Sequence, residues 1–253
     1  MGRCAALATN MACELLTVGQ MAQADALTIE AGTPGFTLMQ AAGRAVAQAI
    51  VQRWSPRATV VLCGPGNNGG DGLVAAAELL QQGWPVRVAM LAEPERLAGD
   101  ARLAWAHWQA RCAACAPGQT LSAVLDEASL DGQALVVDAL FGAGLTRPLE
   151  GMAARVLAKA QRKGLPIVAV DVPSGVAGDT GRSQGAVSCA LTVTFCRLKP
   201  AHLLMPGRAL CGEVVLADIG IPQAVVREAG AQAWENQPGL WSDTWPSVDV
   251  AGH

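Results

Sequence analysis

The fold of this chain follows from residues 59–72, which read TVVLCGPGNNGGDG. The first residues of this stretch are apolar or β-branched, which is typical of a buried strand. A glycine-rich loop comes next, and the Ala- and Leu-rich residues 73–80 predict a helix. A glycine loop that feeds a helix N-terminus favours a bound anion, because backbone N–H groups there are unpaired. We expect its five glycines to approach a ligand closely and to adopt positive φ.

Outward from this stretch, helical and strand patterns alternate along the chain. Thr17 and Gln20 form a capping-box pattern at the start of the first predicted helix. The predicted helices cover residues 18–31, 37–54, 73–82, 95–111, 120–128 and 151–163, and the predicted strands cover 58–63, 86–91, 134–138, 166–171, 190–195 and 213–218. The strands are continuous apolar runs, which indicates a parallel sheet covered on both faces. The sequence therefore predicts an α/β fold.

Composition narrows the class of protein. The chain has 253 residues, of which 51% are hydrophobic and 15% charged, with a net charge of −3. These values suit one large α/β domain and give no basic surface for nucleic acid or membrane lipids. The eight cysteines are not spaced as a disulfide scaffold, and the pair Cys112 and Cys115 lacks a second pair for structural zinc. We expect a cytoplasmic protein with no membrane span, preceded by a disordered leader at residues 1–13.

The predicted strands at residues 134–138 and 166–171 each end on an aspartate. Asp138 and Asp171 each follow an apolar run and precede a loop that contains glycine. Because parallel strands present their carboxyl ends at one edge of the sheet, we expect both aspartates to meet the glycine loop there. Taken singly, each can equally be a turn or capping acid. Together with Asn68 and Ser174 they form an oxygen-only set, which suits a hard cation better than zinc.

Two other functions fit parts of this pattern. Residues 64–69 match the G-x-G-x-x-G pattern, and Glu93 lies where a ribose-binding acid is expected, so an NAD(P)-dependent dehydrogenase is one alternative. Against it, Asp71 would repel a diphosphate, and the chain contains no tyrosine to act as an acid. The second alternative is a non-catalytic interaction domain on the same fold. Such a domain would be expected to lose Asp71, Asp138 and Asp171, yet all three are present.

Three segments, in order, resemble the signatures of a single family. They are NNGGDG at residues 67–72, VDALFG at 137–142 and VDVPSG at 170–175, and they are similar to the NAD(P)H-hydrate epimerases, the YjeF N-terminal domain family. Shorter matches occur at 15–17, 21–25, 32–35, 192–195, 199–200 and 218–222. The resemblance covers residues 14–222, which we expect to form the domain, followed by a tail or linker remnant at 223–253. Residues 234–241 resemble the linker that leads to a fused dehydratase.

The resemblance implies a Rossmann-like three-layer α/β/α sandwich with a mostly parallel central sheet, in a homodimer. It also implies an isomerase of nicotinamide nucleotide repair, which interconverts the R and S epimers of NADHX and NADPHX beside a fused or separate dehydratase. The implied substrate-binding residues are Asn67, Asn68, Gly69, Gly70, Asp71, Gly142, Ala143, Gly144, Leu145, Thr146, Arg147, Pro148 and Asp171. The implied K⁺ ligands are Asn68, Asp138 and Ser174.

Asp171 is the candidate catalytic residue. The two epimers differ at C6 of the nicotinamide ring, where a hydroxyl group lies beside the ring nitrogen. Inversion can proceed by loss and re-addition of water or by ring opening and reclosure. Both routes move protons on oxygen or nitrogen, which a positioned carboxylate can do. We therefore predict that Asp171 is the general acid/base, with either route open.

Overall fold

A seven-stranded sheet forms the centre of the molecule. The structure, a computed structural model, describes residues 13–238. The strands are β2 (Thr59–Cys63), β3 (Val86–Met90), β4 (Ser122–Val124), β5 (Leu135–Ala139), β6 (Ile167–Val170), β7 (Leu191–Phe195) and β8 (Glu213–Ala217). They lie in the order β4-β3-β2-β5-β6-β7-β8, and every neighbouring pair is parallel. The predicted parallel sheet is therefore confirmed.

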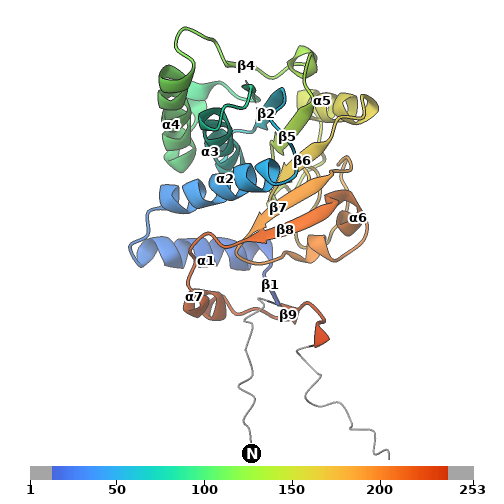
Figure 1. The fold of residues 1–253 in the computed structure, drawn as a ribbon. Helices are drawn as coiled ribbons and strands as arrows, with labels where there is room; N and C mark the ends of the chain where they lie inside the picture. Colours follow the sequence, from blue (N-terminus) through green and yellow to red (C-terminus); the bar gives the residue numbers. More distant parts are fainter. Residues whose placement is uncertain (1–12, 239–253) are drawn as a thin grey trace, which may run out of the picture.

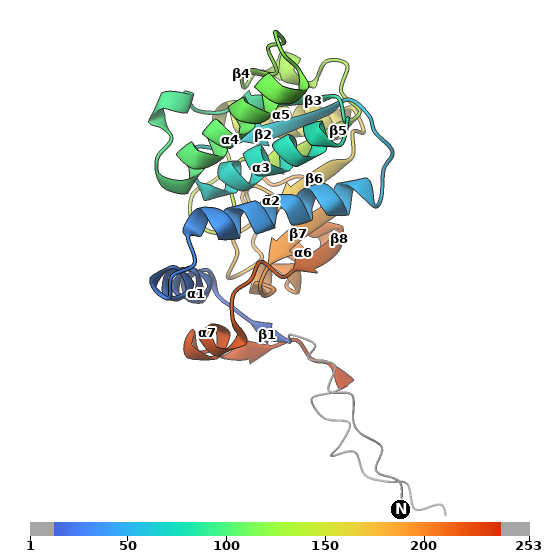
Figure 2. The same cartoon turned by 60° about the vertical axis from the view of Figure 1, so that its left-hand side comes forward.

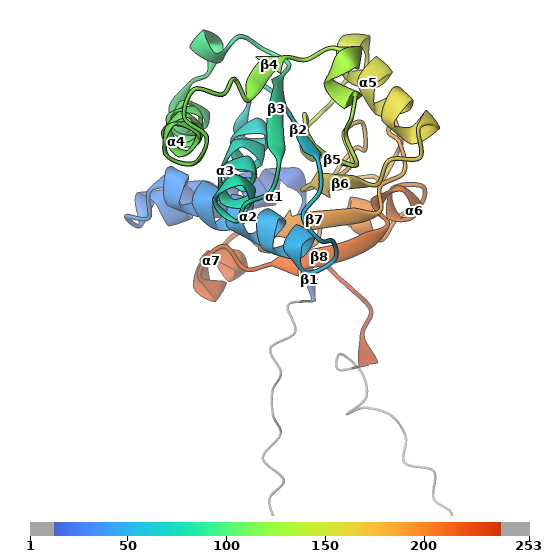
Figure 3. The same ribbon diagram turned by 45° about the horizontal axis from the view of Figure 1, so that its top comes forward.

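Helices cover both faces of this sheet. Helices α2 (Gly35–Val51), α3 (Asn67–Gln81) and α4 (Gly99–Cys115) lie on one face, and α5 (Gly151–Arg162) and α6 (Gly207–Cys211) lie on the other (Figure 3). Figure 2 shows α2, α3 and α4 in front of the strands that they cover. Three short 3-10 turns complete the sandwich: η1 (Pro94–Arg96), η2 (Glu127–Leu130) and η3 (Pro200–His202). This is the expected Rossmann-like α/β/α sandwich.

The remaining elements lie together below the sheet in Figure 1. Helix α1 (Val18–Glu30) lies beside α7 (Gln223–Glu228), and the short strands β1 (Glu14–Leu15) and β9 (Ala233–Trp234) pair antiparallel. The predicted cap of α1 is confirmed, because Gln20 donates its backbone N–H to the Thr17 hydroxyl at 3.2 Å. Among residues 13–238, every helix is too short or too polar to cross a membrane.

Residues after 222 belong to the packed unit. Val226 of α7 is fully buried, and the Gln20 side chain donates a hydrogen bond to the Gly230 carbonyl at 2.7 Å. The domain therefore continues past the boundary that we expected at residue 222. Of the predicted leader only Cys13 is described, and the rest of it lies outside the described residues, as does the predicted tail from residue 239.

Alternate residues of the strands supply two separate cores. In β2, Val61 and Cys63 point toward α2, α3 and α4, while Val60 and Leu62 point toward α5. Trp108 of α4 is fully buried and donates its indole N–H to the Ser122 hydroxyl of β4 at 2.8 Å. Burial of each large apolar side chain stabilises the fold by roughly 1.5–3 kcal/mol. Two cores of this kind hold the carboxyl edge of the sheet in place.

The segment 120–128 was expected to be helical, and this prediction is wrong. Residues 122–124 form the edge strand β4, and η2 begins at Glu127. The ladder explains the difference: Val88 donates its N–H to the Leu121 carbonyl at 2.8 Å, and Leu125 donates to the Met90 carbonyl at 2.8 Å. Pairing with β3 therefore overrides the local helical pattern, as tertiary contacts commonly do for short segments.

Helix α3 begins at Asn67, so the segment NNGGDG forms its first turns and only residues 64–66 remain as a loop. The expected positive φ is absent from all five glycines of this described segment. Close packing accounts for four of them instead, whereas a Cβ on Gly66 would meet nothing within 4 Å. A Cβ on Gly69 would lie 2.0 Å from the Gly64 carbonyl oxygen, and a Cβ on Gly72 would lie 2.4 Å from the Ala139 Cβ. The glycines let α3 approach β2 and β5 of its own chain.

Candidate active site

A cavity of about 560 Å³ opens at the carboxyl edge of the sheet. Its walls come from the loop before α3, from the loop after β5 and from helices α1 and α2. The charged side chains that line it are Asp25, Asp71, Asp100, Asp171 and Lys199. From β2 the sheet continues to β3 and β4, and from β5 it continues in the opposite direction to β6, β7 and β8. The cavity lies where these two halves of the sheet meet, which is the usual position of a ligand in open α/β sheets.

Many of the predicted site residues meet at this cavity. Those that line it are Asn67, Asn68, Asp71, Gly142, Ala143, Gly144, Leu145 and Asp171. Gly69 and Gly70 face the interior instead, and a Cβ on Gly70 would lie 2.6 Å from the Met39 side chain. Thr146, Arg147 and Pro148 follow the lining segment but are not part of the cavity wall. The glycine segment, the loop after β5 and Asp171 therefore converge, as the topology predicts.

The Asp138 carboxylate is fully buried behind the cavity wall. It accepts hydrogen bonds from the Ser174 hydroxyl at 2.7 Å, from the Ser174 N–H at 2.9 Å and from the Leu140 N–H at 3.2 Å. Burial raises the pKa of Asp138 and outweighs these bonds, which lower it. The predicted pair of Asp138 and Ser174 therefore forms one tightly connected unit.

The Ser174 hydroxyl lies close to two hydrogen-bond acceptors but has only one proton to donate. Its hydroxyl oxygen accepts the Phe141 N–H at 2.9 Å and lies 2.7 Å from Asp138 Oδ1 and 3.1 Å from the Phe141 carbonyl oxygen. One hydroxyl proton cannot serve both acceptors fully. Gly142 follows Phe141 in the chain, and a Cβ on Gly142 would lie 3.1 Å from Asn68 Oδ1. The donor chemistry of this corner, all oxygen, fits a hard monovalent cation.

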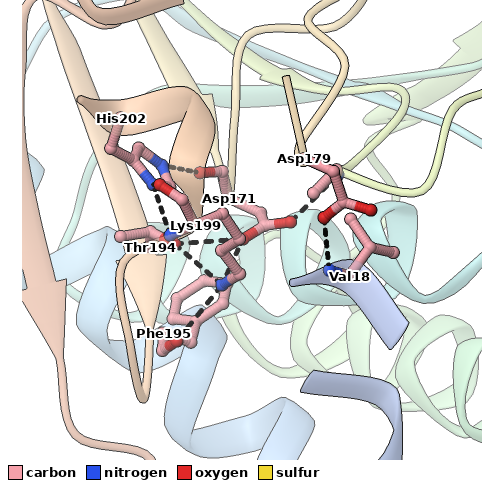
Figure 4. A network of polar contacts seen from close by, with 8 residues as sticks. Val18, Asp171, Asp179, Thr194, Phe195, Lys199 and His202 are labelled. Carbon is pink, nitrogen blue, oxygen red and sulfur yellow. Dashed lines mark hydrogen bonds and ion pairs between the residues drawn. The ribbon is translucent and has the colours of Figure 1, made fainter. Parts of the chain in front are cut away.

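Asp171 is held in place at every polar atom. Its backbone has a φ of 68°, which is rare outside glycine. The Lys199 ammonium lies 2.8 Å from Oδ1, and the Thr194 hydroxyl donates to Oδ1 at 3.0 Å (Figure 4). The Ala143 N–H donates to Oδ2 at 3.0 Å. Strain at such a residue persists only when its surroundings fix it, and it commonly marks a functional site.

The charge of Asp171 follows from these contacts. Burial alone would raise its pKa, but the charge and hydrogen bond of Lys199, with the Ala143 amide, lower the pKa to about 2. Asp171 is therefore ionised at neutral pH. An ionised carboxylate can accept a proton or stabilise a positive charge, but it cannot donate a proton. The acid half of the predicted general acid/base role consequently requires another group.

Lys199 and His202 form a support behind Asp171 that the sequence did not identify. Lys199 is 2% exposed, and its ammonium also donates to the Thr194 hydroxyl at 3.0 Å and to the Phe195 carbonyl at 3.2 Å. The Lys199 N–H donates to His202 Nδ1 at 2.9 Å, so Nε2 carries the proton and donates to the Asp171 carbonyl at 2.9 Å. The only signal was a short family match at residues 199–200, to which no role was attached.

Of the three other carboxyls that line the cavity, Asp25 of α1 and Asp71 of α3 have pKa values that Asp171 affects. Burial raises the pKa of Asp25 to about 6, with Lys199 lowering it and Asp171 raising it. Burial also raises the pKa of Asp71 well above its usual value, and the charges of Asp171 and Asp25 add to this effect. These carboxyls share one ammonium group, so the cavity retains protons near neutral pH.

Glu93, the ribose-binding acid of the dehydrogenase alternative, is exposed at the start of η1 and lies outside the cavity lining. This position gives the dehydrogenase alternative no support.

Within residues 13–238, no group of three or more His, Cys, Asp or Glu side chains suits a metal ion. The seven cysteines described there are all free thiols, and Cys112 and Cys115 are among them.

Comparison with known proteins identifies the family. The family model for the YjeF-related protein N-terminus matches residues 35–201. An NAD(P)H-hydrate epimerase of Rhodobacter capsulatus is 40% identical over 221 residues, which are 82% of this chain and 99% of that protein. An NAD(P)H-hydrate epimerase of Bordetella pertussis is 41% identical over 202 residues, which are 77% of this chain and 84% of that protein.

Longer relatives match over part of their length. The bifunctional NAD(P)H-hydrate repair enzyme Nnr of Thermofilum pendens is 39% identical over 210 residues, which are 79% of this chain but only 39% of that enzyme. The chain thus spans less than half the length of this bifunctional relative. A crystal structure of the yeast protein YNL200c shares the fold, with a TM-score of 0.71 at 23% identity over 88% of this chain and 96% of the yeast chain. Family model, relatives and fold agree that this chain belongs to the YjeF-related protein N-terminus family.

Proposed function

We propose that this chain is an NAD(P)H-hydrate epimerase, an isomerase that interconverts the R and S epimers of NADHX and NADPHX. The observation that carries this proposal is the buried, ionised Asp171, which Lys199 holds at the wall of a cavity next to the start of α3. Relatives from Rhodobacter capsulatus and Bordetella pertussis bear the name of this activity, and this chain covers 99% and 84% of their respective lengths.

The cavity has properties that suit a dinucleotide. Its volume of about 560 Å³ lies within the usual range for small-molecule sites. The free N–H groups at the start of α3, beside Asn67, would bind the diphosphate. A charged Asp71 would oppose this arrangement. Burial and the charges of Asp171 and Asp25 raise the pKa of Asp71, and this shift weakens the repulsion between its carboxyl and a phosphate.

Asp171 would act on the nicotinamide end of the substrate. When the C6 hydroxyl group leaves, the lone pair of the ring nitrogen delocalises and the ring becomes cationic. A fixed carboxylate beside that ring lowers the energy of the cation, because its dipoles and charge are already oriented. We therefore assign Asp171 the stabilisation of developing positive charge. The loop residues Gly142 to Leu145 would form the wall next to Asp171, because the Ala143 N–H donates to its carboxylate.

We further propose that the site takes K⁺. Asn68, Asp138 and Ser174 would hold it, and when bound the ion supplies a fixed positive charge next to the acidic cavity. The oxygen-rich contacts of Ser174 support this assignment, and Asn68 Oδ1, which lies in the same corner next to Gly142, would be the amide ligand. Ions of low charge density favour neutral and anionic oxygen ligands of this kind.

The working context of the protein is proposed from its relatives. The bifunctional repair enzyme Nnr of Thermofilum pendens suggests an NAD(P)HX dehydratase as the functional partner, either fused or separate. We propose a homodimer, and the family resemblance alone supports it. A cytoplasmic location agrees with the free thiols of the described residues, since such thiols persist in reducing compartments.

A pair of measurements on one variant tests the assigned role. Asp171→Asn should bind R-NADHX with an affinity close to that of the unaltered chain but lose catalysed formation of S-NADHX. Spontaneous epimerisation sets the background rate. Full catalytic activity in Asp171→Asn would remove Asp171 from the mechanism. Formation of NADH or NADPH from an alcohol substrate would instead favour the dehydrogenase alternative.

A further inference from the structure

Asp25 is an acid without an assigned role at this cavity. It lies on α1, outside the three signature segments, and lines the cavity together with Asp171 and Lys199. Burial and the charges of Lys199 and Asp171 act on its carboxyl, but no hydrogen bond from the described chain does. A carboxyl that faces a cavity without a protein partner is free to bond to a ligand.

The proposed reaction needs a proton donor that Asp171 cannot be. Loss of the C6 hydroxyl group as hydroxide is unfavourable, and protonation of its oxygen turns the leaving group into water. Asp171 carries no proton at neutral pH, because Lys199, Thr194 and Ala143 all donate to its carboxylate. The donor must therefore be another group on the cavity wall. Carboxyls whose environments push their acidities apart commonly divide the two roles in this way.

We propose that Asp25 is the second catalytic carboxyl of this site and donates a proton to the C6 hydroxyl oxygen of the hydrated nicotinamide. This inference rests on the proposed epimerase function. The O–H bond of Asp25 breaks, the C6–O bond breaks with its electron pair on the departing water, and the N1 lone pair forms an N1=C6 bond. Asp171 faces the resulting cation. Water then adds to either face of C6 and returns its proton to Asp25, so no oxidant or reductant is needed.

The other cavity acids are less suitable donors. Burial, together with the charges of Asp171 and Asp25, raises the pKa of Asp71 well above its usual value, which makes its carboxyl a poorer proton donor. Asp100 lies against Gly35 and Ile29, near the C-terminal end of α1. Asp25 lies midway along α1. Its pKa of about 6 also suits a proton donor, because a donor is most effective when its pKa is near the operating pH.

The four groups that face Asp25 come from three parts of the fold. They are Asp71 of α3, Asp171 after β6, and Cys196 and Lys199 after β7. Of these, only Lys199 favours the ionised form of Asp25, while Asp171 favours the protonated form. Since Lys199 is already paired with Asp171, its effect on Asp25 is limited. The arrangement keeps a proton on Asp25 up to mildly acidic pH.

The experiment compares three chains: the unaltered protein, Asp25→Asn and Glu30→Gln. Glu30 lies on the same helix, is exposed and does not line the cavity, so its variant controls for a lost negative charge on α1. The rates of R-NADHX to S-NADHX conversion are measured across pH, with spontaneous epimerisation subtracted. Binding of R-NADHX and the thermal midpoint are measured for each chain.

We expect Asp25→Asn to lose at least about 100-fold in kcat with little change in KM, since general acids contribute about this much or more. In the unaltered chain and in Glu30→Gln, kcat/KM should fall as pH rises above about 6, the pKa of Asp25. This alkaline fall should disappear from the residual activity of Asp25→Asn, and Asp25→Glu should restore part of the rate.

Two results overturn the inference. One is full activity in Asp25→Asn, and the other is a loss of rate that leaves the alkaline fall in place, which would indicate a structural role. An unaltered chain that does not accelerate epimerisation would instead refute the proposed function itself. The folded state of Asp25→Asn is checked by its thermal midpoint, which should not fall because no hydrogen bond is removed.

Discussion

The Lys199 ammonium lies 2.8 Å from Asp171 Oδ1, and the two side chains are only 3% and 15% exposed. Lys199 comes from the segment after β7, and Asp171 from the end of β6. The pair therefore joins two neighbouring strands at the edge where the cavity opens. It also fixes the charge of the carboxylate on which the proposed chemistry depends.

Removal of Lys199 should destabilise the protein strongly. Lys199→Met leaves the Asp171 carboxylate buried without its ammonium partner, and broken buried pairs typically lower the free energy of unfolding by about 3–5 kcal/mol. Lys163→Met is the matched control, because Lys163 is 40% exposed and pairs with Asp131 at the surface at 3.2 Å. Surface pairs contribute about 0–1 kcal/mol. Urea unfolding of both variants tests this, and equal losses would contradict the buried pair.

The stability effect of Asp25 should depend on pH. Its folded-state pKa is raised from 3.8 to about 6, so the native protein binds a proton more tightly than the unfolded chain does. Stability is therefore highest below the unfolded pKa, falls as pH rises toward 6, and stays reduced above it. Asp25→Asn, which cannot ionise, should be more stable than the unaltered chain by roughly 1–3 kcal/mol at about pH 8. The gain should vanish near about pH 4, and a gain that is independent of pH would contradict this account.

The glycines of α3 should differ sharply in their tolerance of alanine. A Cβ on Gly69 would lie 2.0 Å from the Gly64 carbonyl oxygen, whereas a Cβ on Gly66 meets nothing within 4 Å. Gly69→Ala should therefore lower the free energy of unfolding by about 1–3 kcal/mol or more, as overpacking does. Gly66→Ala should change it by less than about 0.5 kcal/mol. A loss in Gly66→Ala as large as that in Gly69→Ala would contradict the close-packing account, because no neighbour crowds a Cβ on Gly66.

These glycines show what the sequence can and cannot predict. The apolar run before Gly64 was sufficient to place a strand, but the onset of α3 at Asn67 depends on how closely the helix lies against β2 and β5. A local pattern carries no information about that distance. The same limit explains residues 122–124, which become a strand only because β3 offers an unpaired edge.

Some residues of the site can likewise be predicted from the sequence, and others cannot. Asp138 and Asp171 were predictable because each ends an apolar strand, and parallel strands end at one edge. Lys199 was not, because its ammonium reaches Asp171 across a gap of 28 positions in the sequence. Asp25 falls within the short family match at residues 21–25, but that match predicts no role for it, because only the tertiary fold turns its helix toward the cavity.

Potassium should raise the thermal midpoint of the protein. A ligand that binds only the folded state raises the free energy of unfolding. Once the ligand concentration exceeds the dissociation constant, this gain grows with the logarithm of the concentration. We expect KCl to raise the midpoint more than choline chloride at equal ionic strength. Ser174→Ala, which removes the hydroxyl 2.7 Å from Asp138 Oδ1, should lose this difference. An equal response of both chains to KCl would refute the proposed K⁺ ligands.

The rate of R-NADHX to S-NADHX conversion by the purified chain tests the central claim most directly. Chromatographic separation of the two epimers, with and without protein, gives the catalysed and spontaneous rates under one set of conditions. We predict approach to the epimer equilibrium at a rate that is proportional to protein concentration and far above the spontaneous rate. A rate equal to the spontaneous one, in a preparation that is folded and binds R-NADHX, would contradict the assignment of this site as an epimerase.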